Sequence, residues 1–90
     1  MKIGIISDTH GHLDESVFEY FKDCDEIWHA GDIGDLAVTD ALKKFKRLKC
    51  VFGNIDGAEA RREFKETIRF TAGGLVVMMT HIGGRQYVYT

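Results

Sequence analysis

Side chains that commonly bind divalent metals follow four apolar segments of this sequence. Their spacing is regular, because 22 residues separate His10 from Asp32, 22 separate Asp32 from Asn54, and 27 separate Asn54 from His81. Oxygen and imidazole ligands suit Mn, Fe, Ni, Co or Zn, whereas the absence of thiolates argues against a structural zinc site. The sequence therefore indicates a metal site built from carboxylate, imidazole and amide groups, namely Asp8, His10, Asp32, Asn54 and His81.

Apolar and amphipathic segments alternate along the chain and must position these side chains. Strands are predicted over residues 2–7, 26–30 and 49–52, where β-branched or apolar runs end at polar residues or glycine. Helices are predicted over residues 14–22 and 36–45 from apolar residues at helical spacing. Each strand then leads to one of the candidate metal ligands.

The C-terminal third has a different pattern. Residues 58–66 are weakly helical and mostly charged. Residues 67–72 and 75–80 are predicted strands that flank Gly73-Gly74, a two-residue turn typical of hairpins. No element is assigned to residues 81–90.

The order of these elements predicts an α/β fold with a mostly parallel sheet, βαβ units and a C-terminal hairpin. One βα unit occupies roughly the length that separates the candidate ligands, so each repeat returns the chain to the same edge of the sheet. Open α/β sheets bind ligands at the carboxyl edge of their parallel strands. We therefore expect residues 1–90 to form a single domain in which the five candidate ligands converge.

Composition excludes several classes of protein. Twelve Lys and Arg against fourteen Asp and Glu give a net charge of −2, so no basic surplus favours nucleic acid as a partner. The longest apolar run, residues 75–79, is far shorter than a membrane span. Cys24 and Cys50 form no CxxC pattern, and no signal peptide is visible, so we expect a cytoplasmic chain with reduced thiols.

The candidate ligands lie in four short motifs that occur in a fixed order. These are Asp8-x-His10, Gly31-Asp32-Ile33-Gly34-Asp35, Gly53-Asn54-x-Asp56 and Thr80-His81. The set resembles the calcineurin-like metallophosphoesterases, and within them the small bacterial and archaeal phosphodiesterases of the YfcE type. The resemblance extends from Lys2 to about Gly84. It implies that the chain corresponds to the N-terminal half of the αββα sandwich of that family.

The resemblance also implies a two-metal phosphoesterase that acts on a small phosphate ester. Asp8 and His10 would bind the first divalent ion, Asn54 and His81 the second, and the Asp32 carboxylate would bridge them. Such a pair of ions lowers the pKa of a bridging water and clamps the phosphoryl oxygens during in-line displacement. Asp35 and Asp56 would orient the imidazoles and the asparagine amide.

The sequence departs from the family pattern in two places. Ile55 occupies the position where many members have a histidine that serves the phosphoryl group or the leaving oxygen. The Gly-His-x-His segment that completes both metal shells in the family is absent from these residues. We therefore expect a truncated domain that is a poor catalyst and self-associates through the uncovered face of residues 75–79 and the strand edge after it.

Other histidines and other functions also fit parts of the pattern. His12, in a glycine-flanked loop, is a candidate contact to a substrate phosphate, whereas His29 is interpreted as a core histidine. A non-catalytic protein that binds metal or phosphate is a second interpretation of the whole motif set. A third is an aspartyl-phosphate enzyme or receiver domain using Asp8 or Asp32, although His81 stands where those proteins normally have lysine.

Overall fold

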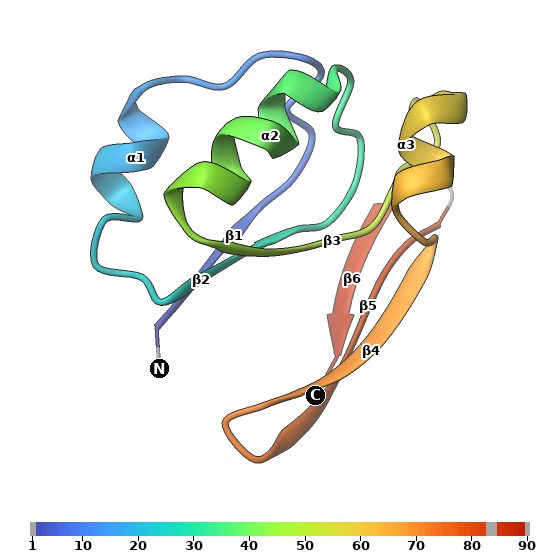
Figure 1. Cartoon of the computed structure of the whole chain (residues 1–90). Coiled ribbons are helices and arrows are strands. Elements are labelled where there is room, and N and C mark those ends of the chain that lie inside the picture. The colour runs from blue at the N-terminus through green and yellow to red at the C-terminus, as the bar shows by residue number, and fades with distance from the viewer. Residues whose placement is uncertain (1, 83–84, 90) are drawn as a thin grey trace.

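A computed structural model of the chain describes residues 2–82 and 85–89. Three parallel strands, β1 (Ile3–Ile6), β2 (Glu26–His29) and β3 (Arg47–Cys50), form a sheet in the order β1-β2-β3 (Figure 1). Strand β3 begins two residues before the predicted strand, because the parallel register pairs Arg47 with the first residue of β2, Glu26. Val51, directly after β3, still donates its N–H to the His29 carbonyl of β2 and also forms a parallel bridge with Lys65.

Two helices cover one face of the parallel sheet, α1 (Ser16–Tyr20) and α2 (Leu36–Phe45) (Figure 1). Helix α2 has the predicted bounds, because the Asp35 side chain accepts a hydrogen bond from the Ala37 N–H and so caps its first turn. Helix α1 is shorter than predicted, since the Asp14 carboxylate accepts the Ser16 N–H ahead of the first turn. The third helix, α3 (Ala58–Glu63), is also shorter than its predicted segment.

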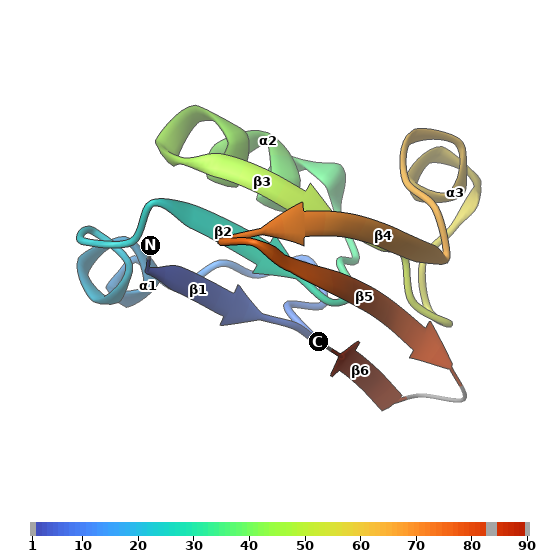
Figure 2. The same ribbon diagram turned by 90° about the horizontal axis from the view of Figure 1, so that it is seen from below.

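A second sheet contains three antiparallel strands, β4 (Thr67–Ala72), β5 (Leu75–Ile82) and β6 (Arg85–Tyr89), in the order β4-β5-β6. The predicted turn joins β4 to β5, and Gly73 and Gly74 both have positive φ angles of 57° and 81°. This sheet does not extend the parallel one at its edge but lies against the face opposite the helices (Figure 2). The fold is therefore mixed α/β with two stacked sheets, as the family resemblance implied.

Strand β2 lies between the helical layer and the second sheet, and its four residues are all buried. Ile27 packs with the helices, in one cluster with Ile33 and Leu42. Trp28 faces the other way, toward Val77, and its ring meets Phe70 edge to face at 4.8 Å between centroids. A strand between two layers buries residues on both faces, which explains its lack of polar alternation.

The face of residues 75–79 is more covered than we expected from the sequence. Strand β5 is the central strand of its sheet, and Val77 and Met79 are buried against the parallel sheet. Leu75, Val76 and Ile82 stay exposed, and among the described residues the unpaired edges of this sheet belong to β4 and β6. Within residues 2–82 and 85–89, no helix is long and apolar enough to cross a membrane.

Candidate metal centre

Three of the predicted ligands lie on backbone that adopts the left-handed conformation. The φ angles are 56° at Asp8, 50° at His10 and 58° at Asp32. Residues with a Cβ occupy this region at a cost of about 1–3 kcal/mol each, and such strain is concentrated at functional sites. The rest of the fold must therefore hold these three residues in place.

Backbone hydrogen bonds between the loops that follow β1 and β2 supply part of this restraint. The Asp8 N–H donates to the Gly31 carbonyl at 3.0 Å, and the His10 N–H donates to the Asp32 carbonyl at 3.1 Å. The Gly11 N–H likewise donates to the Ile33 carbonyl at 2.7 Å. The two ligand-bearing loops are thus joined side by side at the carboxyl edge of the parallel sheet.

The first cluster of ligands contains Asp8, His10 and Asp32. Each offers one nitrogen or oxygen atom, and these atoms all lie within 4.8 Å of one another. Asp32 is buried, whereas the side chains of Asp8 and His10 are 41% and 55% exposed. The cluster is therefore closed on the protein side and open to solvent on the other, as a site for an ion and a substrate must be.

The second cluster is centred on the buried imidazole of His81. Its Nδ1 lies 2.9 Å from the Ala30 carbonyl, which can only accept, so Nδ1 carries the proton. Nε2 then presents a lone pair, and it faces Asn54 Oδ1 at 3.0 Å and Asp32 Oδ2 at 3.4 Å. An imidazole lone pair that faces two oxygen atoms forms a donor set that a cation satisfies, so these residues fit a divalent metal.

Asp32 belongs to both clusters, as a bridging ligand must. Its Oδ1 accepts the Ile55 N–H at 3.2 Å, while Oδ2 faces His81. The residue that replaces the family histidine therefore contributes through its main chain. Gly53 allows this approach, since a Cβ there would lie 2.1 Å from Asp32 Oδ1.

His81 reaches this site by a route that differs from the predicted one. The sequence placed it just after a strand of the C-terminal hairpin, at the same sheet edge as the other ligands, but it lies within β5 of a separate, facing sheet. Gly31 leaves room for its ring, because a Cβ there would lie 2.6 Å from His81 Nδ1. The second sheet thus supplies one of the candidate ligands across the interface between the sheets.

Asp35 and Asp56 contact backbone amides rather than the imidazoles or the asparagine amide they were expected to orient. Asp35 caps α2 and is exposed. Asp56 is buried, and its carboxylate accepts three N–H groups, from Ile33 at 3.1 Å, Gly34 at 2.9 Å and Gly53 at 2.7 Å. It therefore ties the loop that carries Asp32 to the loop that carries Asn54.

His29, the last residue of β2, hydrogen-bonds to the loops that follow β1 and β2. Its position in a predicted strand did not reveal this role. The Gly31 N–H donates to Nδ1 at 3.1 Å, so the proton of the neutral ring is on Nε2. Nε2 donates to Thr9 Oγ1 at 3.0 Å, and that hydroxyl donates to the Ile33 carbonyl at 2.9 Å. The neutral imidazole is thus fully hydrogen-bonded, as expected of a core histidine.

Burial lowers the pKa of His29 from 6.5 to about 4, although the nearby carboxylates of Asp56 and Asp8 oppose this shift. The unfolded chain then binds more protons than the folded chain between these two values. We expect the free energy of unfolding to fall by on the order of 3 kcal/mol as the pH drops from 6.5 through 4. The His29→Gln variant cannot titrate at this position. In urea unfolding measured from pH 7 to 4, its free energy of unfolding should therefore fall less steeply than that of the unmodified chain, by the part due to His29. Parallel curves for the two proteins would contradict the assignment.

Two other residues of interest lie outside the clusters. His12 is exposed on the loop after β1, where its N–H donates to the Thr9 carbonyl, and its role as a phosphate contact stays a prediction. Cys50 is buried, and burial raises the pKa of its thiol, so it remains protonated. The candidate ligands are therefore oxygen and imidazole groups, in line with the sequence.

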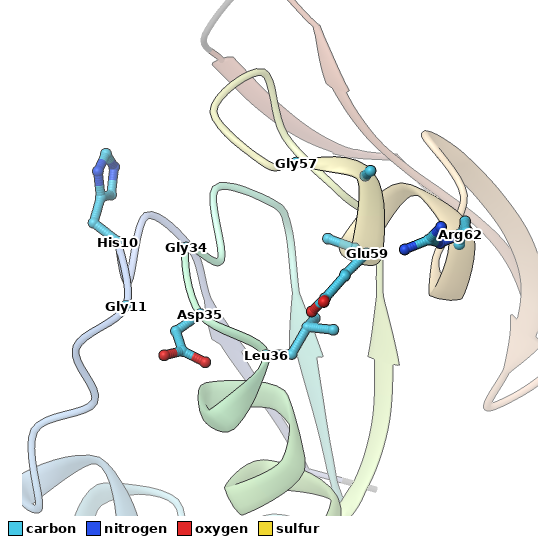
Figure 3. A pocket seen from close by; sticks show the side chains of 10 residues that line it. His10, Gly11, Gly34, Asp35, Leu36, Gly57, Glu59 and Arg62 are labelled. Atoms are coloured by element: carbon cyan, nitrogen blue, oxygen red, sulfur yellow. The ribbon is translucent and has the colours of Figure 1, made fainter.

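A hollow of about 820 Å³ opens beside the first cluster (Figure 3). His10 belongs to both the cluster and the hollow. The walls are formed by the start of α2 at Asp35 and Leu36 and by α3, from which Glu59 and Arg62 extend. Space for a ligand larger than a phosphate thus exists next to the candidate ligands.

Two solved structures resemble this fold over most of its length. A conserved Streptococcus pneumoniae protein described as a predicted phosphoesterase is 26% identical with a TM-score of 0.62, over 88% of this chain and 44% of that one. Chaetomium thermophilum Vps29 is 21% identical with a TM-score of 0.68, over 84% of this chain and 43% of that one. The second likeness shows the fold alone.

Sequence relatives agree with the structural ones. A probable metallophosphoesterase of Methanocaldococcus jannaschii is 41% identical over 61 residues, which are 62% of this chain and 32% of that protein. A probable metallophosphoesterase of Methanothermobacter thermautotrophicus is 39% identical over 61 residues, which are 62% of this chain and 36% of that protein. The match thus spans about a third of these relatives. The family model of the calcineurin-like phosphoesterase superfamily domain matches residues 1–89, and the chain belongs to this superfamily.

Proposed function

We propose that this chain contributes a two-metal site for the hydrolysis of small phosphate esters. The observation that carries the proposal is the convergence of both ligand clusters on one carboxylate. Asp32 lies within 4.8 Å of the ligand atoms of Asp8 and His10, and its Oδ2 lies 3.4 Å from His81 Nε2. A carboxylate has two oxygens and can neutralise two neighbouring cations, which suits a dinuclear centre.

Each residue has a defined task in this proposal. Divalent cations bound here would supply Lewis-acid charge that activates water and stabilises phosphoryl oxygens. The Ala30 carbonyl fixes the His81 tautomer that leaves Nε2 free for a metal, and the Ile55 N–H orients the Asp32 carboxylate. Asp8 and His10 form the exposed side, from which a phosphate ester enters. Family membership favours this chemistry over an aspartyl-phosphate intermediate.

Metal dependence is the direct test. The chain should bind two divalent ions per molecule by titration calorimetry. Hydrolysis of bis-p-nitrophenyl phosphate or p-nitrophenyl phosphate should stop in excess chelator and return with Mn²⁺, Ni²⁺ or Co²⁺, because the proposal uses no side-chain nucleophile. Activity that persists after chelation and dialysis would overturn the metal mechanism. Tight binding of metal without turnover across these ions would favour a non-catalytic metal- or phosphate-binding protein.

The exposed apolar residues of the second sheet support a proposal about assembly. Leu75, Val76 and Ile82 are 58%, 57% and 58% exposed, and within the part of the chain that the structure describes β6 pairs with β5 alone. Unpaired strand edges beside apolar side chains recruit another chain. We expect a dimer or larger species in sedimentation velocity experiments, and Val76→Lys should shift it toward monomer. A monodisperse monomer at micromolar concentration would contradict this expectation.

A further inference from the structure

We propose that the hollow beside the first cluster binds the alcohol portion of the substrate, and that this portion is a neutral hydroxyl-bearing group such as a sugar or polyol. The inference rests on the proposed function, because it takes the phosphate of the same ester to lie at the candidate metal ligands. His10 connects the two places, since it belongs to the ligand cluster and also lines the hollow.

The size of the hollow favours an organic group over a bare phosphate. Its volume of about 820 Å³ is larger than a phosphate needs, and the hollow is open to solvent, so it would cover one side of such a group. Leu36, Ala58 and Ala60 supply apolar surface, and Gly57 has open space where a Cβ would stand. The carbon-bound faces of a sugar ring can pack against such a surface, while its hydroxyl groups meet the polar walls.

The charges of the hollow select the chemistry of that group. Glu59 and Arg62 lie one turn apart on α3, and among the described residues neither has a hydrogen-bond or ion-pair partner. Asp35 adds a second carboxylate, one oxygen of which caps α2. Figure 3 shows the Glu59 side chain reaching toward Leu36, across the space between α3 and the start of α2.

Ions and apolar groups each leave part of this wall unsatisfied. An ammonium group would be attracted by Asp35 and Glu59 but repelled by Arg62, and an anionic group would meet the reverse, so neither ion is satisfied by all three side chains. An aryl group would cover these charges without offering them hydrogen bonds. A hydroxyl group donates to a carboxylate and accepts from a guanidinium, so a neutral group with several hydroxyls satisfies both kinds of side chain.

The test measures binding rather than turnover. Amide chemical shifts of the Zn²⁺-loaded chain would be followed during titration with four probes: ribose 5-phosphate, phosphoethanolamine, phenyl phosphate and inorganic phosphate. We expect ribose 5-phosphate to bind about tenfold more tightly than the other three, with shifts at Gly34, Gly57 and Ala58. A factor of ten corresponds to about one added hydrogen bond to a charged side chain.

Variants separate this subsite from the metal site. Glu59→Ala and Arg62→Ala should each weaken ribose 5-phosphate binding five- to tenfold more than they weaken inorganic phosphate binding. Glu66→Ala, just before β4, and Arg69→Ala, within β4, remove exposed charges of the same types. These two variants should change neither the affinity for ribose 5-phosphate nor that for inorganic phosphate. Equal affinity for all phosphates, or a preference for phosphoethanolamine or phenyl phosphate, would overturn the inference alone. Failure of inorganic phosphate to bind the loaded chain would overturn the proposed function and the subsite with it.

Discussion

Replacing Asp32 by asparagine should reduce metal binding more than any other single substitution, from two ions per chain to none at the same metal concentration. Asparagine keeps the shape, tolerates the left-handed backbone and still accepts the Ile55 N–H, but it removes the negative charge that both clusters share. The affinity for metal should fall by more than about 100-fold. Removing a group that only hydrogen-bonds to a metal ligand costs up to about 100-fold, and Asp32 is proposed to bind the metal directly. Calorimetry with Mn²⁺ or Zn²⁺ gives both stoichiometry and affinity.

Single-cluster variants provide the matched comparison. Asp8→Asn alters the first cluster and leaves the contacts of His81 with Asn54 and with Asp32 intact, so one ion should remain. Asn54→Ala alters the second cluster in the same way and leaves Asp8 and His10 in place. If either variant removes both ions, or removes more affinity than Asp32→Asn does, Asp32 is not the bridging ligand.

The parallel half of the fold could be predicted because its signals are local. Helix α2 has the predicted bounds, since an aspartate at its start and lysines in its last turn mark its ends. The start of β3 was two residues off, because pairing of Arg47 with Glu26 in the neighbouring strand sets it. Pairing of this kind depends on the whole sheet and leaves no mark in the segment itself.

The convergence of the ligands was anticipated partly for the wrong structural reason. The spacing argument treated His81 as the end of one more parallel strand, yet it reaches Asn54 and Asp32 from the opposing sheet. Residue spacing counts chain length and does not distinguish an added strand from a stacked one. The family resemblance carried that information, since it implied a sandwich.

The residues that support the site were harder to recognise than the ligands. His29 was interpreted as a core histidine, which its burial bears out, but its contacts with Gly31 and Thr9 depend on loops brought together by folding. Asp35 and Asp56 looked equivalent in the sequence, as acidic residues near a ligand. Only their different burial and hydrogen bonds separate a helix cap from a link between two loops.

Asp56→Asn should therefore destabilise the chain strongly, whereas the same change at Asp35 should have little effect. The Asp56 carboxylate accepts three backbone N–H groups in a buried place, and an asparagine would turn an NH₂ group toward one of those donors. Hydrogen bonds to a charged group are worth roughly 1.5–3 kcal/mol each, so a loss of about 3–5 kcal/mol is expected. That is a large part of the roughly 5–13 kcal/mol expected for a domain of this length.

Asp35→Asn makes the identical chemical change at an exposed helix cap, where asparagine serves as well as aspartate, so its loss should stay below about 0.5 kcal/mol. Urea unfolding of both variants measures the difference, and metal titration in the absence of urea adds a second readout. Because Asp56 links the loops of Asp32 and Asn54, its variant should also bind the second ion more weakly under conditions where it remains folded. Equal stability of the two variants would show that the three amides find other acceptors, and that the loops do not depend on this carboxylate.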